Sequence, residues 1–161
     1  MSSTLSAHRD TALVTYEDLK VIEAPGSTRY WRPVQHIELV DTLKAGLTSL
    51  GMRVEREQFA VGSEGRKLFG TFDIAGADLV NGVGSALGFR HSNDKRIAIQ
   101  IVGGGRVFVC DNMMLSGDIT LLKQKHTWGY SLRNLIDKGL SAWQGKQRAF
   151  VGNIERLVNT P

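Results

Sequence analysis

The chain contains one cysteine among its 161 residues, and this scarcity excludes a framework of internal disulfide bonds. It also contains only three prolines and no apolar run near the roughly 20 residues that a membrane span needs. Its first ten residues lack the apolar centre of a secretory signal. We therefore expect a cytoplasmic protein without a membrane segment, and the length predicts one core rather than two domains.

The net charge of +4 is distributed unevenly along the chain. Residues 1–80 contain 9 Lys/Arg against 11 Asp/Glu, a net charge of −2, whereas residues 81–161 contain 11 against 5, a net charge of +6. A regional excess of positive charge favours binding of anions. Polyanions and anionic small molecules are therefore the partners to consider, and a merely solvated surface is the alternative.

The first half of the chain predicts one long helix followed by a hairpin. Apolar residues recur with helical spacing from Ile37 to Leu50, and Gly51 follows as a C-terminal cap, so we expect a helix over 34–50. Residues 52–61 and 67–74 are typical of strands, joined by a Gly-Ser-Glu-Gly turn. Residues 1–15 are predicted to be a flexible N-terminal tail before a single domain over 16–158, with a short helix or strand over 16–22.

Residues 85–112 alternate between apolar and other side chains, which predicts a three-stranded antiparallel meander. The three glycines at 103–105 are interpreted as its second turn. A first turn over 92–96 would pair His91 with Ile97. The odd-numbered side chains then form the apolar face, because successive side chains of a strand point to opposite sides. Residues 76–84 are expected to be a flexible connection into this meander.

The even-numbered face of the meander is small, polar and basic, with one aromatic ring. Lysines and arginines bind phosphates and aromatic rings stack on bases, so this face and the loop near residue 125 predict a binding site for single-stranded nucleic acid or another anion. The alternative is that the face forms a second core layer under a helix. The candidate binding residues are Arg90, Lys95, Arg96, Gln100, Arg106, Phe108, Lys123, Lys125 and Trp128.

The last third of the chain predicts helices. Residues 113–124 are interpreted as helical, and an apolar stripe from Leu132 to Trp143 predicts a long helix that begins near Ser131, with an interruption at 144–146. Together the elements predict an α+β fold in which helices pack on one face of an antiparallel sheet of about five strands.

Four short motifs between about Trp31 and Trp143 give the chain a family resemblance. They are Pro33-Val34-Gln35-His36, His91-Ser92-Asn93-Asp94, Arg106-Val107-Phe108-Val109-Cys110-Asp111-Asn112 and His126-Thr127. In this order they resemble a phage- and plasmid-encoded family grouped as a domain of unknown function, number nine hundred and thirty-two in the common catalogue. The resemblance implies a mobile-element origin, a setting rich in replication, recombination and anti-defence functions. It assigns family-motif status to the polar residues His91, Ser92, Asn93, Asp94, Cys110, Asn112, His126 and Thr127.

These observations support three functional hypotheses. The first is a non-catalytic protein that binds single-stranded DNA in replication or annealing-type recombination, with oligomerisation through an uncovered sheet edge. The second is an anti-defence protein that sequesters a nucleotide signal, its phosphate held by backbone N–H groups of the glycines at 82–84 and 103–105.

The third hypothesis is an enzyme. His91, Asp94, Cys110, Asp111 and His126 could converge into a metal or nucleophilic site, but they lack the close His or Cys pairs typical of such sites. We therefore expect no metal and no cofactor. A lone cysteine at a strand end is typical of a small buried apolar group. We expect His91 to cap a strand end or to be solvated.

Overall fold

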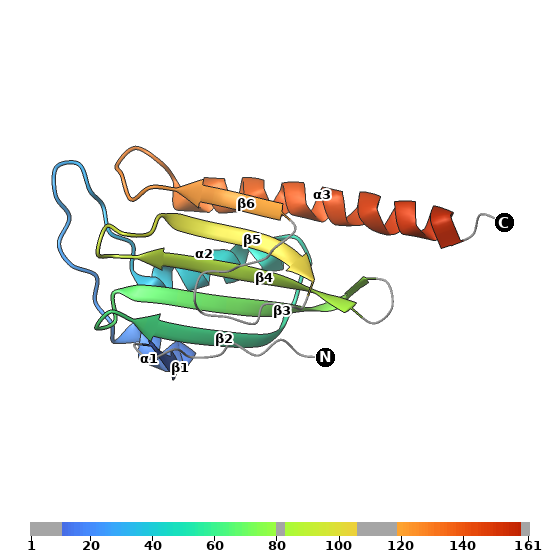
Figure 1. The fold of residues 1–161 in the computed structure, drawn as a ribbon. Helices are drawn as coiled ribbons and strands as arrows, with labels where there is room; N and C mark the ends of the chain where they lie inside the picture. Colours follow the sequence, from blue (N-terminus) through green and yellow to red (C-terminus); the bar gives the residue numbers. More distant parts are fainter. Residues whose placement is uncertain (1–10, 80–82, 106–118, 159–161) are drawn as a thin grey trace.

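The computed structural model describes residues 11–79, 83–105 and 119–158, which form one six-stranded antiparallel sheet and three helices (Figure 1). The strands lie side by side in sequence order, β1 to β6. The α+β class is confirmed, and the sheet has six strands where about five were expected. The elements are β1 Thr11–Val14, α1 Tyr16–Lys20, α2 His36–Ser49, β2 Val54–Gly62, β3 Lys67–Leu79, β4 Val83–Ser92, β5 Ile99–Gly105, β6 Ile119–Gln124 and α3 Leu132–Val158.

Helices α2 and α3 pack on the same face of the sheet, as the sequence predicted. Figure 1 shows α2 behind the sheet and α3 running along β6 and beyond it. Each fully buried aliphatic or aromatic side chain contributes about 1.5–3 kcal/mol. The core between the layers contains Leu39, Val40, Leu43 and Leu47 of α2, Leu132, Ile136, Leu140 and Trp143 of α3, and Phe59, Leu68, Phe72, Leu87, Phe89, Ile99 and Ile101 of the sheet.

The predicted helix and hairpin of the first half are confirmed. Helix α2 ends beside Gly51, whose φ of 73° lies in the left-handed region, and the Met52 amide donates to the Leu47 carbonyl at 2.9 Å. The turn between β2 and β3 also needs the left-handed region, because Ser63, Glu64 and Gly65 have φ values of 50°, 59° and 84°. This turn holds the Gly65 carbonyl close to the start of α2.

The face assignment for β4 and β5 is confirmed, but their register differs from the prediction. Phe89 lies opposite Ile101 and Arg90 opposite Gln100, which shifts the expected pairing of His91 with Ile97 by two residues. Because side chains alternate with a period of two, an even shift keeps the residues of β4 and β5 on their expected faces. Ile97, which precedes β5, was expected on the same face as Phe89, but it packs against Ala60 and Phe69 instead.

The glycines at 103–105 do not form a turn, and that prediction is wrong. They belong to β5 and pair with residues 85–87 of β4. The physical reason is the helix above them, since a Cβ on Gly103 would collide with the indole ring of Trp143. Four predicted site residues after this strand lie outside the described residues: Arg106, Phe108, Cys110 and Asn112.

Four other boundaries are corrected. Residues 119–124 form β6 rather than a helix, because pairing with β5 satisfies their backbone groups. Residues 11–14 of the expected tail form β1 on the edge of β2, and Thr15 caps α1 with a capping box. Residues 76–79 and 83–84 of the expected flexible connection extend β3 and β4. Helix α3 continues through 144–146 without interruption.

Candidate functional site

One end of the sheet holds a pocket of about 480 Å³ where three separate segments meet. These segments are the chain before α2, the turn between β4 and β5, and the end of β6 with the residues that follow it. The lining is basic and aromatic, and a volume of this size suits a small organic ligand or one nucleotide. The pocket is lined by Tyr30, Trp31, Lys95, Arg96, Ile97, Ala98, Lys123, Lys125, His126 and Thr127.

Backbone hydrogen bonds join the first and third of these segments. The Arg32 amide donates to the His126 carbonyl at 3.0 Å. The indole N–H of Trp128 donates to the Thr28 carbonyl at 2.9 Å, across 100 positions of sequence. The two segments therefore hold each other in place, although each is irregular on its own.

Asn93 joins the same chain segment to the β4–β5 turn. Its side-chain amide accepts from the Val34 N–H at 3.1 Å and donates to the Val34 carbonyl at 2.8 Å, and both bonds are buried. Inside the turn, Asp94 accepts from the Ser92 hydroxyl and the Arg96 amide, at 2.5 and 3.1 Å. Burial would raise the pKa of Asp94, but these two hydrogen bonds lower it below its ordinary value.

The cations of the pocket have few protein partners. Arg96 has a weak ion pair with Asp94 at 3.8 Å. In the described part of the chain, Lys95, Lys123 and Lys125 have no ion pair. Lys95 Nζ instead lies 5.2 Å from the centroid of the Trp31 ring, where the face of the indole attracts a cation. Positive charge therefore remains uncompensated beside the cavity.

Aromatic side chains lie in and next to the same pocket. Tyr30 lines it and is 75% exposed, and Trp128, two residues after His126, is 53% exposed. The Arg32 guanidinium lies 5.6 Å from the centroid of the Trp128 ring. The buried Nε1 of Trp31 has no hydrogen-bond partner in the described structure, and such a donor is rare in folded proteins.

A chain of three buried histidines runs from the core to this pocket. Nδ1 of His36 lies 2.9 Å from Nε2 of His91, and Nδ1 of His91 lies 3.0 Å from Nε2 of His126. The inner end is fixed by the Gly65 carbonyl, 2.6 Å from Nε2 of His36. The outer end is His126, which lines the pocket. Each ring comes from a different element: the first turn of α2, strand β4 and the segment after β6.

All three histidines have a pKa below the ordinary value of 6.5. For His36 and His126 the main cause is burial. For His91, which is fully buried, the pKa lies well below 6.5 because of burial and of repulsion from the imidazoles on both sides. All three imidazole rings are therefore neutral at neutral pH. Among the described residues, no group of three or more His, Cys, Asp or Glu is arranged to hold a metal.

The structure brings most of the described candidate residues together. Lys95, Arg96, Lys123, Lys125, His126 and Thr127 line the pocket, and Trp128 is adjacent. Ser92, Asn93 and Asp94 build the turn beside it, and His91 is the central ring of the histidine chain. The expectation that His91 caps a strand or is solvated is wrong, because its side chain is 0% exposed.

Arg90 and Gln100 lie apart from the pocket, on the sheet face opposite the helices. Arg90 Nε donates to Oε1 of Gln100 at 2.8 Å, so this guanidinium is already engaged. Gln100 is in turn the register partner of Lys123 on β6, which places a polar row from β4 to the pocket. Other side chains of this face, including Thr71 and Asp73, are buried.

Sequence reasoning missed His36, Tyr30 and Trp31 as site residues. His36 carried a usable signal, because it precedes Leu39, Leu43 and Leu47 on the apolar stripe of α2. A histidine on a core face must find a polar partner there. His91 carried the same signal on the apolar face of β4. No local pattern marks Tyr30 or Trp31, since the pocket forms only when distant segments meet.

The described glycines of the cradle proposed for a phosphate lie in strands, and Gly82 lies outside the described residues. Gly84 belongs to β4, and the glycines at 103–105 belong to β5 and lie in ladders between strands. Backbone groups of paired strands are used in the sheet, so they do not form an exposed anion cradle.

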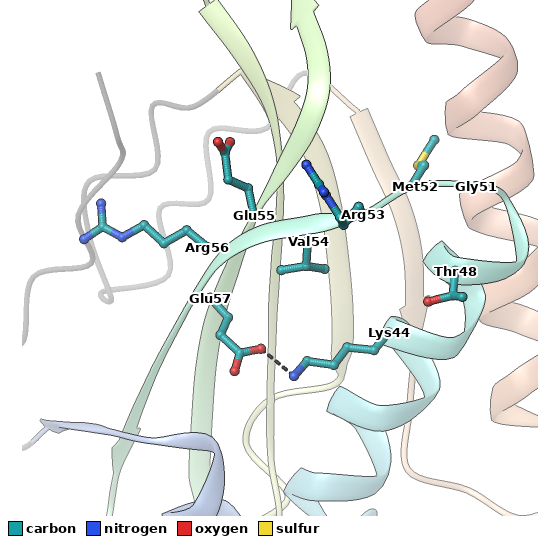
Figure 2. A pocket seen from close by; sticks show the side chains of 9 residues that line it. All are labelled: Lys44, Thr48, Gly51, Met52, Arg53, Val54, Glu55, Arg56 and Glu57. Atoms are coloured by element: carbon teal, nitrogen blue, oxygen red, sulfur yellow. Dashed lines mark ion pairs between the residues drawn. The ribbon is translucent and has the colours of Figure 1, made fainter.

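A second pocket, of about 680 Å³, lies between the end of α2 and the start of β2 (Figure 2). Figure 2 shows the ion pair that joins Lys44 to Glu57 across it, with Nζ and Oε2 2.5 Å apart. Its other charged residues are Arg53, Glu55 and Arg56, so charges of both signs line it. This mixture gives no preference for an anion or a cation, and no candidate residue from the sequence lies here.

Comparison with protein-family models, curated proteins and solved structures finds no match to this chain. The family resemblance carried by the four motifs therefore stays a prediction. In the described parts of the chain, no helix combines the length and the apolar character that crossing a bilayer requires.

Proposed function

We propose that this protein binds single-stranded nucleic acid, most directly single-stranded DNA, through the basic and aromatic pocket at the end of the sheet. The observation that carries the proposal is the convergence of four cationic side chains with Tyr30 and Trp31 around one cavity. Proteins that bind single strands combine cations for the phosphates with aromatic rings for the bases. Three of the four cations have no ion pair in the described structure, which leaves them available to phosphates.

The pocket also explains why a single strand suits the site better than a duplex. A cavity of about 480 Å³ accepts one or two splayed bases but not a base-paired helix. Tyr30 and Trp128 are exposed on its rim, where unstacked bases can reach them. Lys123 lies beside Gln100 on the neighbouring strand, and these polar side chains offer a path for the strand away from the pocket.

A second candidate function is capture of a nucleotide signal, supported by the nucleotide-sized volume of the same pocket. Both functions involve an anionic nucleotide ligand, so they are distinguished by the length of the ligand that binds more tightly, a strand or a single nucleotide. We also propose, from the sequence motifs, an origin in phages or plasmids and a role in replication or annealing-type recombination. A cytoplasmic location is proposed from the composition, and a non-catalytic role with oligomerisation through a sheet edge is proposed as well.

The proposal is tested by fluorescence anisotropy with a labelled single-stranded 20-mer of deoxyadenosine, the matching duplex and dAMP as competitor. We expect the single strand to bind more tightly than the duplex and dAMP to compete weakly. Tyr30→Ala should weaken single-strand binding at least about fivefold, since base stacking contributes about 1–3 kcal/mol, whereas Tyr30→Phe keeps the ring and should keep the affinity. Tighter binding of dAMP than of the 20-mer would favour the sequestration function, and binding of neither at low salt would refute both.

A further inference from the structure

The histidine chain has only one arrangement of protons when it is neutral. A carbonyl oxygen can only accept, so Nε2 of His36 must carry the hydrogen that is donated to Gly65. A neutral imidazole has one N–H, so Nδ1 of His36 is an acceptor and receives the hydrogen on Nε2 of His91. By the same step, Nδ1 of His91 receives the hydrogen on Nε2 of His126.

The last nitrogen in this series is Nδ1 of His126, and the series leaves it without a hydrogen. It has no hydrogen-bond partner in the described structure, although His126 lines the pocket. The backbone carbonyl of Gly65 therefore fixes, through three rings, a bare lone pair on the imidazole of His126, a residue that lines the pocket. A solvated histidine exchanges between its two tautomers, but this one is restricted to the acceptor form.

The surroundings keep this nitrogen unprotonated. His91 lies beside the Nε2 side of this ring, and Lys95, Arg96, Lys123 and Lys125 line the same pocket as His126. The nearest carboxylate in these segments, Asp94, is already bonded to Ser92 and Arg96. Burial lowers the pKa of His126, so the pocket combines four cations with one neutral acceptor.

We propose that Nδ1 of His126 determines specificity by accepting a hydrogen bond from a neutral O–H or N–H group of the bound nucleotide, while the lysines hold its phosphates. This inference rests on the proposed function and narrows its ligand class. In an adenine nucleotide within a strand, the chemistry used in the test below, two groups can donate in this way: the 2′-hydroxyl of ribose and the exocyclic amine of the base. His36 and His91 are positioning residues that select the tautomer, and they do not touch the ligand.

The tautomer is measured first, by long-range ¹H–¹⁵N NMR of the histidine rings in the wild-type protein at neutral pH. We expect an unprotonated Nδ1 and a protonated Nε2 at His126. In His36→Phe, which removes the link to Gly65, we expect the two tautomers of His126 to exchange. A protonated Nδ1 in the wild-type protein would overturn the inference without any variant.

The acceptor is then tested with four single-stranded probes: oligo(rA), oligo(2′-O-methyl-A), oligo(dA) and oligo(deoxynebularine), which lacks the exocyclic amine. A neutral hydrogen bond contributes about 0.5–1.5 kcal/mol, so loss of the donor should weaken binding about twofold to tenfold. Weaker binding of the methylated probe identifies the ribose hydroxyl, and weaker binding of the nebularine probe identifies the amine. His126→Phe should abolish the difference, and His126→Gln, whose amide oxygen can accept, should restore part of it.

Different results would refute the proposed function and the role of His126. If none of the probes binds at low salt, the proposed function is wrong. If all four bind equally to the wild-type protein, nucleic-acid binding stands and the role of His126 is refuted.

Discussion

Replacement of Lys123 and Lys125 by alanine gives the sharpest quantitative test of the pocket. Both lysines line it, and neither has an ion pair in the described structure. Phosphate contacts release counterions, so affinity for a single strand falls with salt with a slope of about −0.7 per contact. With four lining cations engaged, the slope of log affinity against log salt should be about −2.8, and affinity should fall about 50-fold between about 50 and 200 mM salt.

The double variant keeps two of the four cations. Its slope should be about −1.4, and its affinity should fall only about sevenfold over the same range of salt. The assay is fluorescence anisotropy with oligo(dA) at five or so salt concentrations. The matched control is Lys138→Ala with Lys146→Ala, which removes the same net charge from exposed positions of α3 that do not line the pocket.

The control should keep the wild-type slope within error. If both double variants lower the slope equally, binding depends on net charge and not on this pocket. If the pocket variant keeps a slope of about −2.8, its two lysines do not contact phosphates and the site assignment is wrong.

Two further predictions concern stability. Because the folded pKa values of His36, His91 and His126 lie below the unfolded value of 6.5, the unfolded state binds more protons as pH falls below 6.5. As the pH is lowered from about 7.5 to 5.5, the free energy of unfolding should therefore fall by up to about 1.4 kcal/mol for each histidine that stays neutral in the folded state. A free energy of unfolding from urea denaturation that does not change with pH would contradict the burial of the three histidines. Gly103→Ala should lower the free energy of unfolding by about 1–3 kcal/mol, because the new Cβ would collide with the indole of Trp143. Gly145→Ala in α3, where the space around the residue is open, should raise it by up to about 1 kcal/mol. Equal shifts of the melting temperature in the two variants would contradict this packing.

The sequence predicted those parts of the fold that depend on local periodicity. The spacing of apolar residues along the sequence predicted helix α2, the β2–β3 hairpin and the side of β4 and β5 that faces the core. Phe89 and Ile101 lie on their predicted face although the predicted register was wrong by two residues, because only an odd shift exchanges the faces of a strand.

The errors arose where tertiary contacts override local preference. The three glycines at 103–105 are typical of a turn, yet they lie in β5 under Trp143, a residue 40 positions later than Gly103. The local sequence of residues 119–124 suits a helix about as well as a strand. Their conformation is decided by the edge of β5, with which they pair.

The candidate site was predicted in its residue types but not in its geometry. Lys95, Lys123 and Lys125 were recognised as basic residues near turns, but their convergence depends on hydrogen bonds such as Trp128 to Thr28. The histidine chain joins residues 55 and 35 positions apart, so no local window could contain it. Histidines placed on apolar faces were the one local sign that buried polar partners exist.

Binding of nucleic acid in the pocket at the end of the sheet can be mapped by a ¹H–¹⁵N NMR titration of the labelled protein with single-stranded oligo(dA). We expect the largest shift changes on residues 30–31, 95–98 and 123–128, with little change along α2. Changes confined to other surfaces, or none at saturating oligonucleotide and low salt, would contradict it.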